Sequence, residues 1–168
     1  LIDLARAGRM DVLILRVPLI YGPGMKGNML SLFKAVNKGL VLPLKYTNNK
    51  RDLIYVHNLV DAIMHTIERP KFPKKIYYVC DSEPVSTANL VRKIACALDK
   101  PARLISLPAS ILKILGWIMG QSNGIRKLTQ TLEVDGTEFC EDAEWGSPFS
   151  MKEGLASTAA WFKRPSIK

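Results

Sequence analysis

The sequence contains no apolar run long enough to cross a bilayer. Its most apolar stretch covers residues 110–119, about half of the ~20 residues that a transmembrane helix requires. No basic segment followed by an apolar run and a small-residue cleavage site opens the chain, so nothing in it indicates a secretory signal. We therefore expect no membrane span and a cytoplasmic location.

Cysteine and histidine are scarce. Cys80, Cys96 and Cys140 form an odd, widely spaced set, which excludes a disulfide framework and a CxxC metal pair. The two histidines, His57 and His65, have no acidic or cysteine partner at ligand spacing, so we expect no metal site. Because no Gly-x-Ser-x-Gly motif and no Cys/His pairing is present, we expect no catalytic residue in these 168 residues.

Basic residues outnumber acidic ones, and the net charge is +9. Residues 1–132 carry 20 Lys and Arg against 8 Asp and Glu, whereas residues 133–168 carry 4 against 7. Such a distribution is typical of a protein that binds an anionic partner. The partner could be nucleic acid, an acidic lipid surface or a phosphorylated small molecule. A solvated basic surface is the alternative. A nucleic-acid-binding module is disfavoured, because the basic residues are scattered and aromatic residues do not alternate with them.

The apolar periodicity predicts alternating strands and helices, hence an α/β fold. Residues 11–17 form a nearly continuous apolar run, which predicts a strand buried on both faces as in a parallel sheet, and the Gly- and Pro-rich segment 18–27 predicts a loop. Shorter strands are predicted at 51–56, 76–80 and 103–107. Helices are predicted at 1–8, from Asn28 to Gly39, from Asn58 to Pro70, after Ser86, at 108–119 and after Ser150. The number of predicted strands is low for a complete doubly wound sheet.

Capping residues and apolar stripes orient the predicted helices. Asn28 is predicted to be an N-cap, and Asn58 with Asp61 and Ser150 with Glu153 have the spacing of capping boxes. Helix 108–119 is predicted to pack against the rest of the protein rather than on a membrane. The inward residues are predicted to be Met29, Leu32, Phe33 and Val36; Leu59, Val60, Ile63, Met64 and Ile67; Leu90, Val91, Ile94, Ala95 and Leu98; and Met151, Leu155, Ala159 and Phe162.

Two sequence segments match known cofactor-site motifs, but neither has the structural context that its motif requires. Residues 22–27 read GPGMKG and fit GxGxxG, yet Pro23 removes a backbone N–H and no carboxylate follows until Asp52, where a dinucleotide site needs one about 20 residues on. Residues 46–50 read YTNNK and fit YxxxK, but such a pair must share a helix face, and this segment favours a loop. Neither motif predicts a cofactor site.

An ordered set of segments resembles a known family. The set comprises LRVPLIYGPG at 15–24, RDLIYVHNLVDAI at 51–63, DSEPVS at 81–86, VDGT at 134–137, and EWGSPFSMKEGL at 144–155. In this order they resemble the extended short-chain dehydrogenase/reductases, and within them the NAD-dependent nucleotide-sugar epimerases and dehydratases. Members are about twice as long, so the resemblance implies that residues 1–168 are a C-terminal, substrate-binding portion. The NAD-binding turn and the catalytic Tyr/Lys pair would then lie in an absent N-terminal half.

The resemblance also implies roles for individual residues. Pro18 and Tyr21 would lie beside the nicotinamide and the sugar. Asn28 and its helix, Arg51 and Arg126 would hold the nucleotide diphosphate, with Lys127 as the alternative to Arg126, and residues 40–50 would border the base. Alternatives stay open: a plain N-cap for Asn28, an ion pair with Asp52 or Asp61 for Arg51, and an ordinary surface charge for Arg126.

The implied activity belongs to the longer parent protein. It is the NAD-dependent 4-epimerisation of a UDP-sugar through a 4-keto intermediate, carried out by a homodimer. A reductase or dehydratase of the same family and a non-catalytic remnant are the alternatives. Departures from the family pattern at Gly136, Thr137 and Ala143 affect positions of packing and capping and leave the sugar unspecified.

Overall fold

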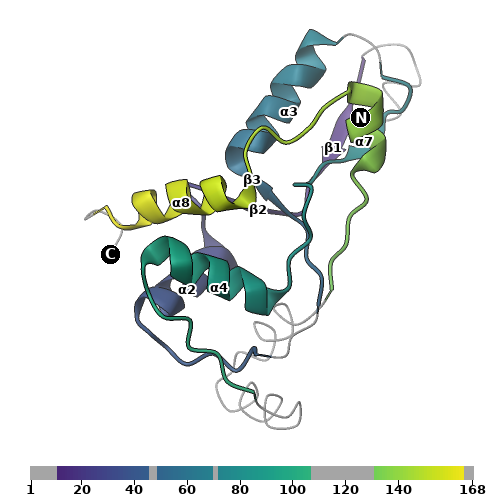
Figure 1. The fold of residues 1–168 in the computed structure, drawn as a ribbon. Coiled ribbons are helices and arrows are strands. Elements are labelled where there is room, and N and C mark those ends of the chain that lie inside the picture. Colours follow the sequence, from purple (N-terminus) through teal and green to yellow (C-terminus); the bar gives the residue numbers. More distant parts are fainter. Residues whose placement is uncertain (1–10, 46–48, 70–71, 107–130, 165–168) are drawn as a thin grey trace.

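The computed structural model describes residues 11–45, 49–69, 72–106 and 131–164 (Figure 1). The helices predicted at 1–8 and 108–119, and Arg126 with Lys127, lie outside the described residues.

Two short parallel strand pairs form the centre of the fold. β1 (Ile14–Arg16) pairs with β4 (Ile76–Tyr78), and β2 (Leu19–Tyr21) pairs with β3 (Leu53–Tyr55). Parallel neighbours need a long connection between them, and α2 (Gly27–Asn37) and α3 (Val56–Glu68) lie in these connections. The α/β prediction is therefore confirmed.

The strand predictions need three corrections. The segment 18–27 is not all loop, because β2 follows Pro18 directly. Proline has no N–H to donate, so the β1 ladder ends there and the chain continues in the other sheet. Only three residues of the predicted strand 11–17 are extended, and the segment is half-buried, because β4 borders one of its edges only. The strand predicted at 103–107 amounts to an isolated bridge between Leu104 and Leu42.

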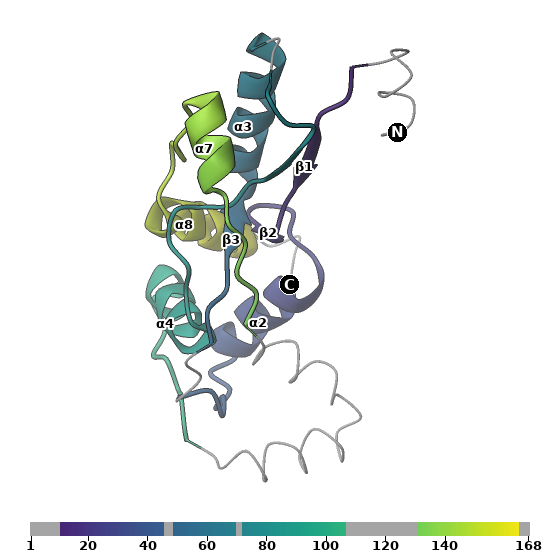
Figure 2. The ribbon, with the colours of Figure 1, turned by 90° about the vertical axis from the view of Figure 1, so that its right-hand side faces the viewer.

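Three helices enclose the larger hydrophobic cluster. α2, α4 (Thr87–Leu98) and α8 (Met151–Phe162) pack against one another at one end of the molecule (Figures 1 and 2). The rings of Phe33 and Phe162 lie 5.8 Å apart between them. Every residue predicted to face inward on these three helices is buried. The predicted caps of α4 and α8 form as well: Ser86 accepts a hydrogen bond from the Asn89 N–H, and Ser150 and Glu153 make a reciprocal capping box.

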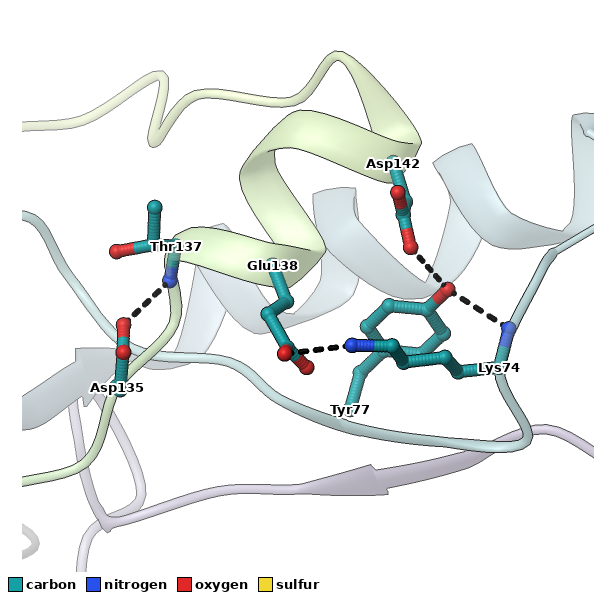
Figure 3. Close-up of polar contacts among 6 residues, drawn as sticks. All are labelled: Lys74, Tyr77, Asp135, Thr137, Glu138 and Asp142. Atoms are coloured by element: carbon teal, nitrogen blue, oxygen red, sulfur yellow. Dashed lines mark hydrogen bonds and ion pairs between the residues drawn. The ribbon is translucent and has the colours of Figure 1, made fainter.

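A second cluster joins β4 to α3 and α7 (Thr137–Ala143). Its buried members are Ile54, Ala62, Tyr77, Val79, Phe139, Ala143 and Trp145. Figure 3 shows how α7 is fixed: the Tyr77 hydroxyl donates to Asp142 at 2.6 Å and accepts from the Lys74 N–H at 3.1 Å. The Lys74 ammonium also pairs with Glu138 on the first turn of α7. One buried tyrosine thus ties the strand to the helix.

Helix α3 faces the opposite way from the prediction. Of the residues expected to face inward, Val60, Ile63, Met64 and Ile67 are 51%, 41%, 51% and 70% exposed. Only Leu59 is half-buried, and it packs against the second cluster. The buried residues are instead Asn58 and Ala62. The capping box at Asn58 is also wrong, because the helix begins two residues earlier, at Val56. Asn58 lies in its first turn and is held inward by hydrogen bonds to distant segments, which sets the rotation of the helix.

Candidate functional site

A buried polar junction lies where β2, β3 and β4 end. Asp81, three residues beyond β4, accepts a hydrogen bond at Oδ2 from the Tyr21 hydroxyl at 3.2 Å and from the Tyr55 N–H at 3.1 Å. Its Oδ1 accepts from the Asn58 amide nitrogen at 2.7 Å. One carboxylate therefore joins the carboxyl ends of the strands, which is the edge where open α/β folds bind ligands.

Asn58 extends this junction to the C-terminal part of the chain. Its Nδ2 donates to the Phe149 carbonyl at 2.9 Å, and its Oδ1 accepts from the Phe149 N–H at 3.0 Å. This two-way bond fixes the segment that leads into α8 against the start of α3.

Glycine allows α8 to approach the junction closely. A Cβ added at Gly154 would lie 2.8 Å from the Tyr21 hydroxyl and 2.9 Å from Cγ of Tyr55. The two tyrosine rings lie 5.5 Å apart beneath it. Gly22, directly after β2, has a φ of +142°, and a Cβ there would lie 2.4 Å from Cγ1 of Val56. Both positions require the absence of a side chain.

Burial dominates the electrostatics of the junction. It raises the pKa of the Asp81 carboxyl, and the hydrogen bonds from Asn58, Tyr55 and Tyr21 oppose that rise only in part. It also raises the pKa of Tyr21 far above its ordinary value, and the neighbouring Asp81 carboxylate adds to the effect. Tyr21 is fully buried, so its side chain supports the strand ends. The expected position of Tyr21 beside a cofactor stays a prediction. The same holds for Pro18, which is half-buried and lies between β1 and β2.

Arg51 is held by its backbone between two distant segments. Its N–H donates to the Val85 carbonyl at 3.0 Å and its carbonyl accepts from Val85 at 2.9 Å, just ahead of α4. The next residue, Asp52, bonds through its N–H to the Leu132 carbonyl, and its carboxylate accepts from the Val134 N–H at 2.6 Å. Arg51 is half-buried, and burial lowers the pKa of its guanidinium.

The two carboxylates considered as partners of Arg51 bond to other donors. Asp52 is occupied by Val134, and Asp61 accepts from the Trp145 indole at 2.8 Å. Asp52 is buried, whereas Asp61 is exposed.

Asn28 does not cap its helix. α2 begins at Gly27 with Lys26 in the N-cap position and no side-chain cap, so Asn28 lies exposed in the first turn. The prediction of an N-cap is wrong because Gly27, at a φ of +62°, starts the helix one residue earlier. The N–H groups of a first helical turn lack intrahelical partners and favour an anion. A role for this helix start toward a diphosphate therefore rests on its backbone.

The loop expected to border a nucleotide base is fixed at its far end. Asn49 is buried, its amide donates to the Thr87 hydroxyl at 3.0 Å, and it accepts from the Thr87 N–H at 3.1 Å. The loop is thereby anchored to the first turn of α4. Lys50, the lysine of the YxxxK motif, forms a surface ion pair with Glu133.

Sequence reasoning did not find Asp81, Asn58 and Phe149 as one unit. Asp81 carried a usable signal, since a carboxylate directly after an apolar strand either faces a site or needs buried donors. Nothing local marked its donors, because Asn58 lies 23 residues away and Phe149 bonds across 91 residues.

No group of three or more His, Cys, Asp or Glu side chains in the described part of the chain is arranged to hold a metal ion. Among the described helices, none is long and apolar enough to cross a membrane. Among the described residues, six basic side chains pair with carboxylates on the surface, each within 4.0 Å: Lys50, Arg69, Lys74, Lys75, Lys93 and Lys163.

Comparison with known proteins supports the family resemblance. The model of the NAD dependent epimerase/dehydratase family matches residues 1–80. A UDP-glucose 4-epimerase from Vibrio cholerae is 40% identical over 163 residues, which is 96% of this chain and 50% of that enzyme. The chain is therefore similar in sequence to NAD-dependent epimerases and dehydratases. It spans about half the length of the curated relatives it matches.

Solved structures of this family share the fold. A UDP-N-acetylglucosamine 4-epimerase from Bacillus cereus superposes with a TM-score of 0.72 at 11% identity, over 96% of this chain and 50% of the other. A dTDP-glucose 4,6-dehydratase from Bacillus anthracis, solved in complex with NAD, gives 0.70 at 16% identity, over 98% and 49%. The chain therefore has the Rossmann-like α/β architecture predicted from its sequence.

Proposed function

We propose that this chain is the substrate-binding portion of a cytoplasmic, homodimeric NAD-dependent epimerase that inverts C4 of a UDP-sugar through a 4-keto intermediate. The observation that carries the proposal is the 40% identity to a UDP-glucose 4-epimerase, which extends over 96% of the chain. The chain contributes binding and orientation of the nucleotide sugar. The absent half contributes the catalytic pair.

Arg51 and the start of α2 are the proposed diphosphate site. A half-buried guanidinium forms stronger charge-assisted hydrogen bonds than one in water. The backbone hydrogen bonds to Val85 fix the position of the Arg51 backbone, from which the side chain would extend toward the diphosphate. Asn28 would act through the first-turn N–H groups of α2. Arg126 joins this set as a proposal from the resemblance. By the resemblance, Pro18 and Tyr21 would lie beside the nicotinamide and the sugar.

The GxGxxG match at residues 22–27 does not fit the phosphate-binding turn of an NAD site. In the GxGxxG spelling, Gly22 packs against Val56, where a Cβ would approach to 2.4 Å, so this glycine serves chain packing. Pro23 offers no N–H to a pyrophosphate. We therefore place NAD mainly in the half of the family's chain that these residues do not cover.

Substrate binding tests the proposal. The chain would be joined to the half of the Vibrio cholerae enzyme that it does not match, and UDP-glucose binding would be measured by calorimetry. A charge-assisted hydrogen bond contributes about 1.5–3 kcal/mol, so Arg51→Ala should weaken binding roughly 10- to 100-fold. Arg92→Ala, on the exposed surface of α4, is the matched control and should bind normally. Equal affinity of the parent and Arg51→Ala would reject the assigned role.

A reductase or dehydratase of the same family is the second candidate. The motivating observations are a ceramide reductase from Caulobacter vibrioides that is 23% identical over 96% of the chain, and the dehydratase structure above. Analysis of the products from UDP-glucose separates the candidates, since an epimerase returns the 4-epimer and a dehydratase releases water. Salt-dependent retention of nucleic acid on a filter would instead favour the basic binding module.

A further inference from the structure

Basic residues collect where the last turns of α2, α4 and α8 meet. The three helix ends line one hollow of about 480 Å³, which Asn37, Lys100 and Lys163 border. Segments 34–42, 98–105 and 159–164 carry six basic residues and a single acidic one, Asp99. All six basic side chains are exposed: Lys34, Lys38, Lys100, Arg103, Lys163 and Arg164. Within the described ranges, only Lys163 among them pairs with a carboxylate, that of Asp99 at 3.0 Å.

The helix ends themselves do not neutralise this charge. Each helix C-terminus carries roughly −0.5 of an elementary charge on its carbonyl groups, so three ends offset about 1.5 of the net five positive charges in these segments. One such carbonyl is already used, since the Arg103 guanidinium donates to Gly39, two residues past α2, at 3.4 Å. The surface therefore stays strongly positive and favours an anionic partner.

Apolar side chains point outward from the same loops. Leu42 and Leu104 form an isolated parallel bridge, and both pack against the larger hydrophobic cluster. Because side chains alternate along extended backbone, the neighbouring Val41, Arg103 and Ile105 face the opposite way, into solvent. Val41 is 51% exposed and Ile105 is 43% exposed. Exposed apolar residues among basic ones form an amphipathic surface, in which both kinds of side chain can contact one partner.

We propose that this basic end of the molecule docks on a bilayer surface that contains anionic phospholipids. The basic side chains contact the headgroup phosphates, while Val41, Ile105 and the exposed Leu40 enter the boundary between headgroups and acyl chains. Nucleic acid would use the charges alone, and a second copy of this chain would bring two positive surfaces face to face. A lipid surface accounts for both the charges and the apolar residues.

The proposed docking surface is separate from the proposed diphosphate site. That site includes the start of α2, whereas the docking surface lies at the end of the same 11-residue helix, about 16 Å away. A docked molecule can therefore bind its substrate at the other end of α2. The inference does not depend on which nucleotide sugar binds, or on whether one does.

Co-sedimentation of the 168-residue chain with lipid vesicles tests this surface. Phosphatidylcholine vesicles with about a quarter phosphatidylglycerol should bind the chain, and phosphatidylcholine alone should not. A basic residue near an anionic surface changes affinity roughly fivefold, so Lys38→Gln/Lys100→Gln should weaken binding about 25-fold. Val41→Ser/Ile105→Ser keeps every charge and should weaken binding at least about fivefold.

Arg16→Gln/Lys152→Gln is the matched control, because it removes the same two charges from exposed positions elsewhere. Arg16 lies on β1, away from α2 and α4 (Figures 1 and 2), and Lys152 lies at the opposite end of α8 from Lys163. This variant should bind within about twofold of the parent. Circular dichroism checks that each variant keeps the helix content of the parent, as expected for exposed substitutions.

Several results would overturn the proposal. The parent chain does not sediment with the anionic vesicles, the control loses as much affinity as Lys38→Gln/Lys100→Gln, or Val41→Ser/Ile105→Ser binds like the parent. Retention of duplex DNA on a filter without vesicle binding would assign the surface to nucleic acid instead. A dimer that Val41→Ser/Ile105→Ser converts to a monomer would assign it to a second copy of the chain.

Discussion

Replacing Gly154 by alanine tests the close approach of α8 to the junction. An alanine Cβ would lie 2.8 Å from the Tyr21 hydroxyl and 3.0 Å from its Cε2. Both tyrosines are buried, and Tyr21 is also bonded to Asp81, so neither ring can move without breaking a contact. Overpacking of this kind costs about 1–3 kcal/mol, whereas alanine gains about 1 kcal/mol over glycine in a helix interior. Because the added Cβ meets the rings of both Tyr21 and Tyr55, we expect a cost in the upper part of that range and a net loss of about 1–2 kcal/mol in the free energy of unfolding.

Urea denaturation followed by circular dichroism measures this loss. Gly146→Ala is the control, because a Cβ there meets nothing within 4 Å, and it should cost nothing. Tyr21→Phe removes the nearest atom, so the double variant Tyr21→Phe/Gly154→Ala should lose less than the sum of the single changes. The reasoning is refuted if Gly154→Ala is as stable as the parent, or if the two changes are strictly additive.

Two further predictions concern pH and capping. Because burial raises the pKa of the Asp81 carboxyl, the folded state binds the proton of this group more tightly than the unfolded state does. This contribution to stability falls as the pH rises from the pKa of the unfolded state, about 3.9, through the pKa of the folded state. Asp81→Asn should remove that slope in unfolding free energies measured from pH 4 to 7, and the exposed Asp99→Asn is the comparison; an unchanged slope contradicts it. Ser150→Ala should lower the free energy of unfolding by about 1 kcal/mol by removing the capping box, and a loss near zero would contradict that.

The helices could be predicted wherever local signals decide them. The stripes of α2, α4 and α8 and the caps at Ser86 and Ser150 depend on neighbours within a few residues, and the structure confirms them. β2 was missed because its three residues follow a proline and precede a Gly-rich turn, which together are typical of a loop. Pairing with β3, more than 30 residues on, makes it a strand.

The rotation of α3 could not be predicted from its own sequence. Amphipathicity indicates which face is apolar, but it does not say which partner covers that face. The inward face is set by Asn58, whose partners are Asp81 and Phe149. The same long-range bonding explains why the polar junction was not foreseen as a unit.

Turnover of UDP-glucose is the most direct test of the proposed function. The chain joined to its complementary half would be supplied with NAD and UDP-glucose, and formation of the 4-epimer would be followed by chromatography. The account predicts that the 4-epimer forms and that Arg51→Ala raises KM with little change in kcat, since a diphosphate contact binds ground state and transition state alike. A folded, NAD-binding protein that forms no 4-epimer, or whose KM is indifferent to Arg51→Ala, would contradict it.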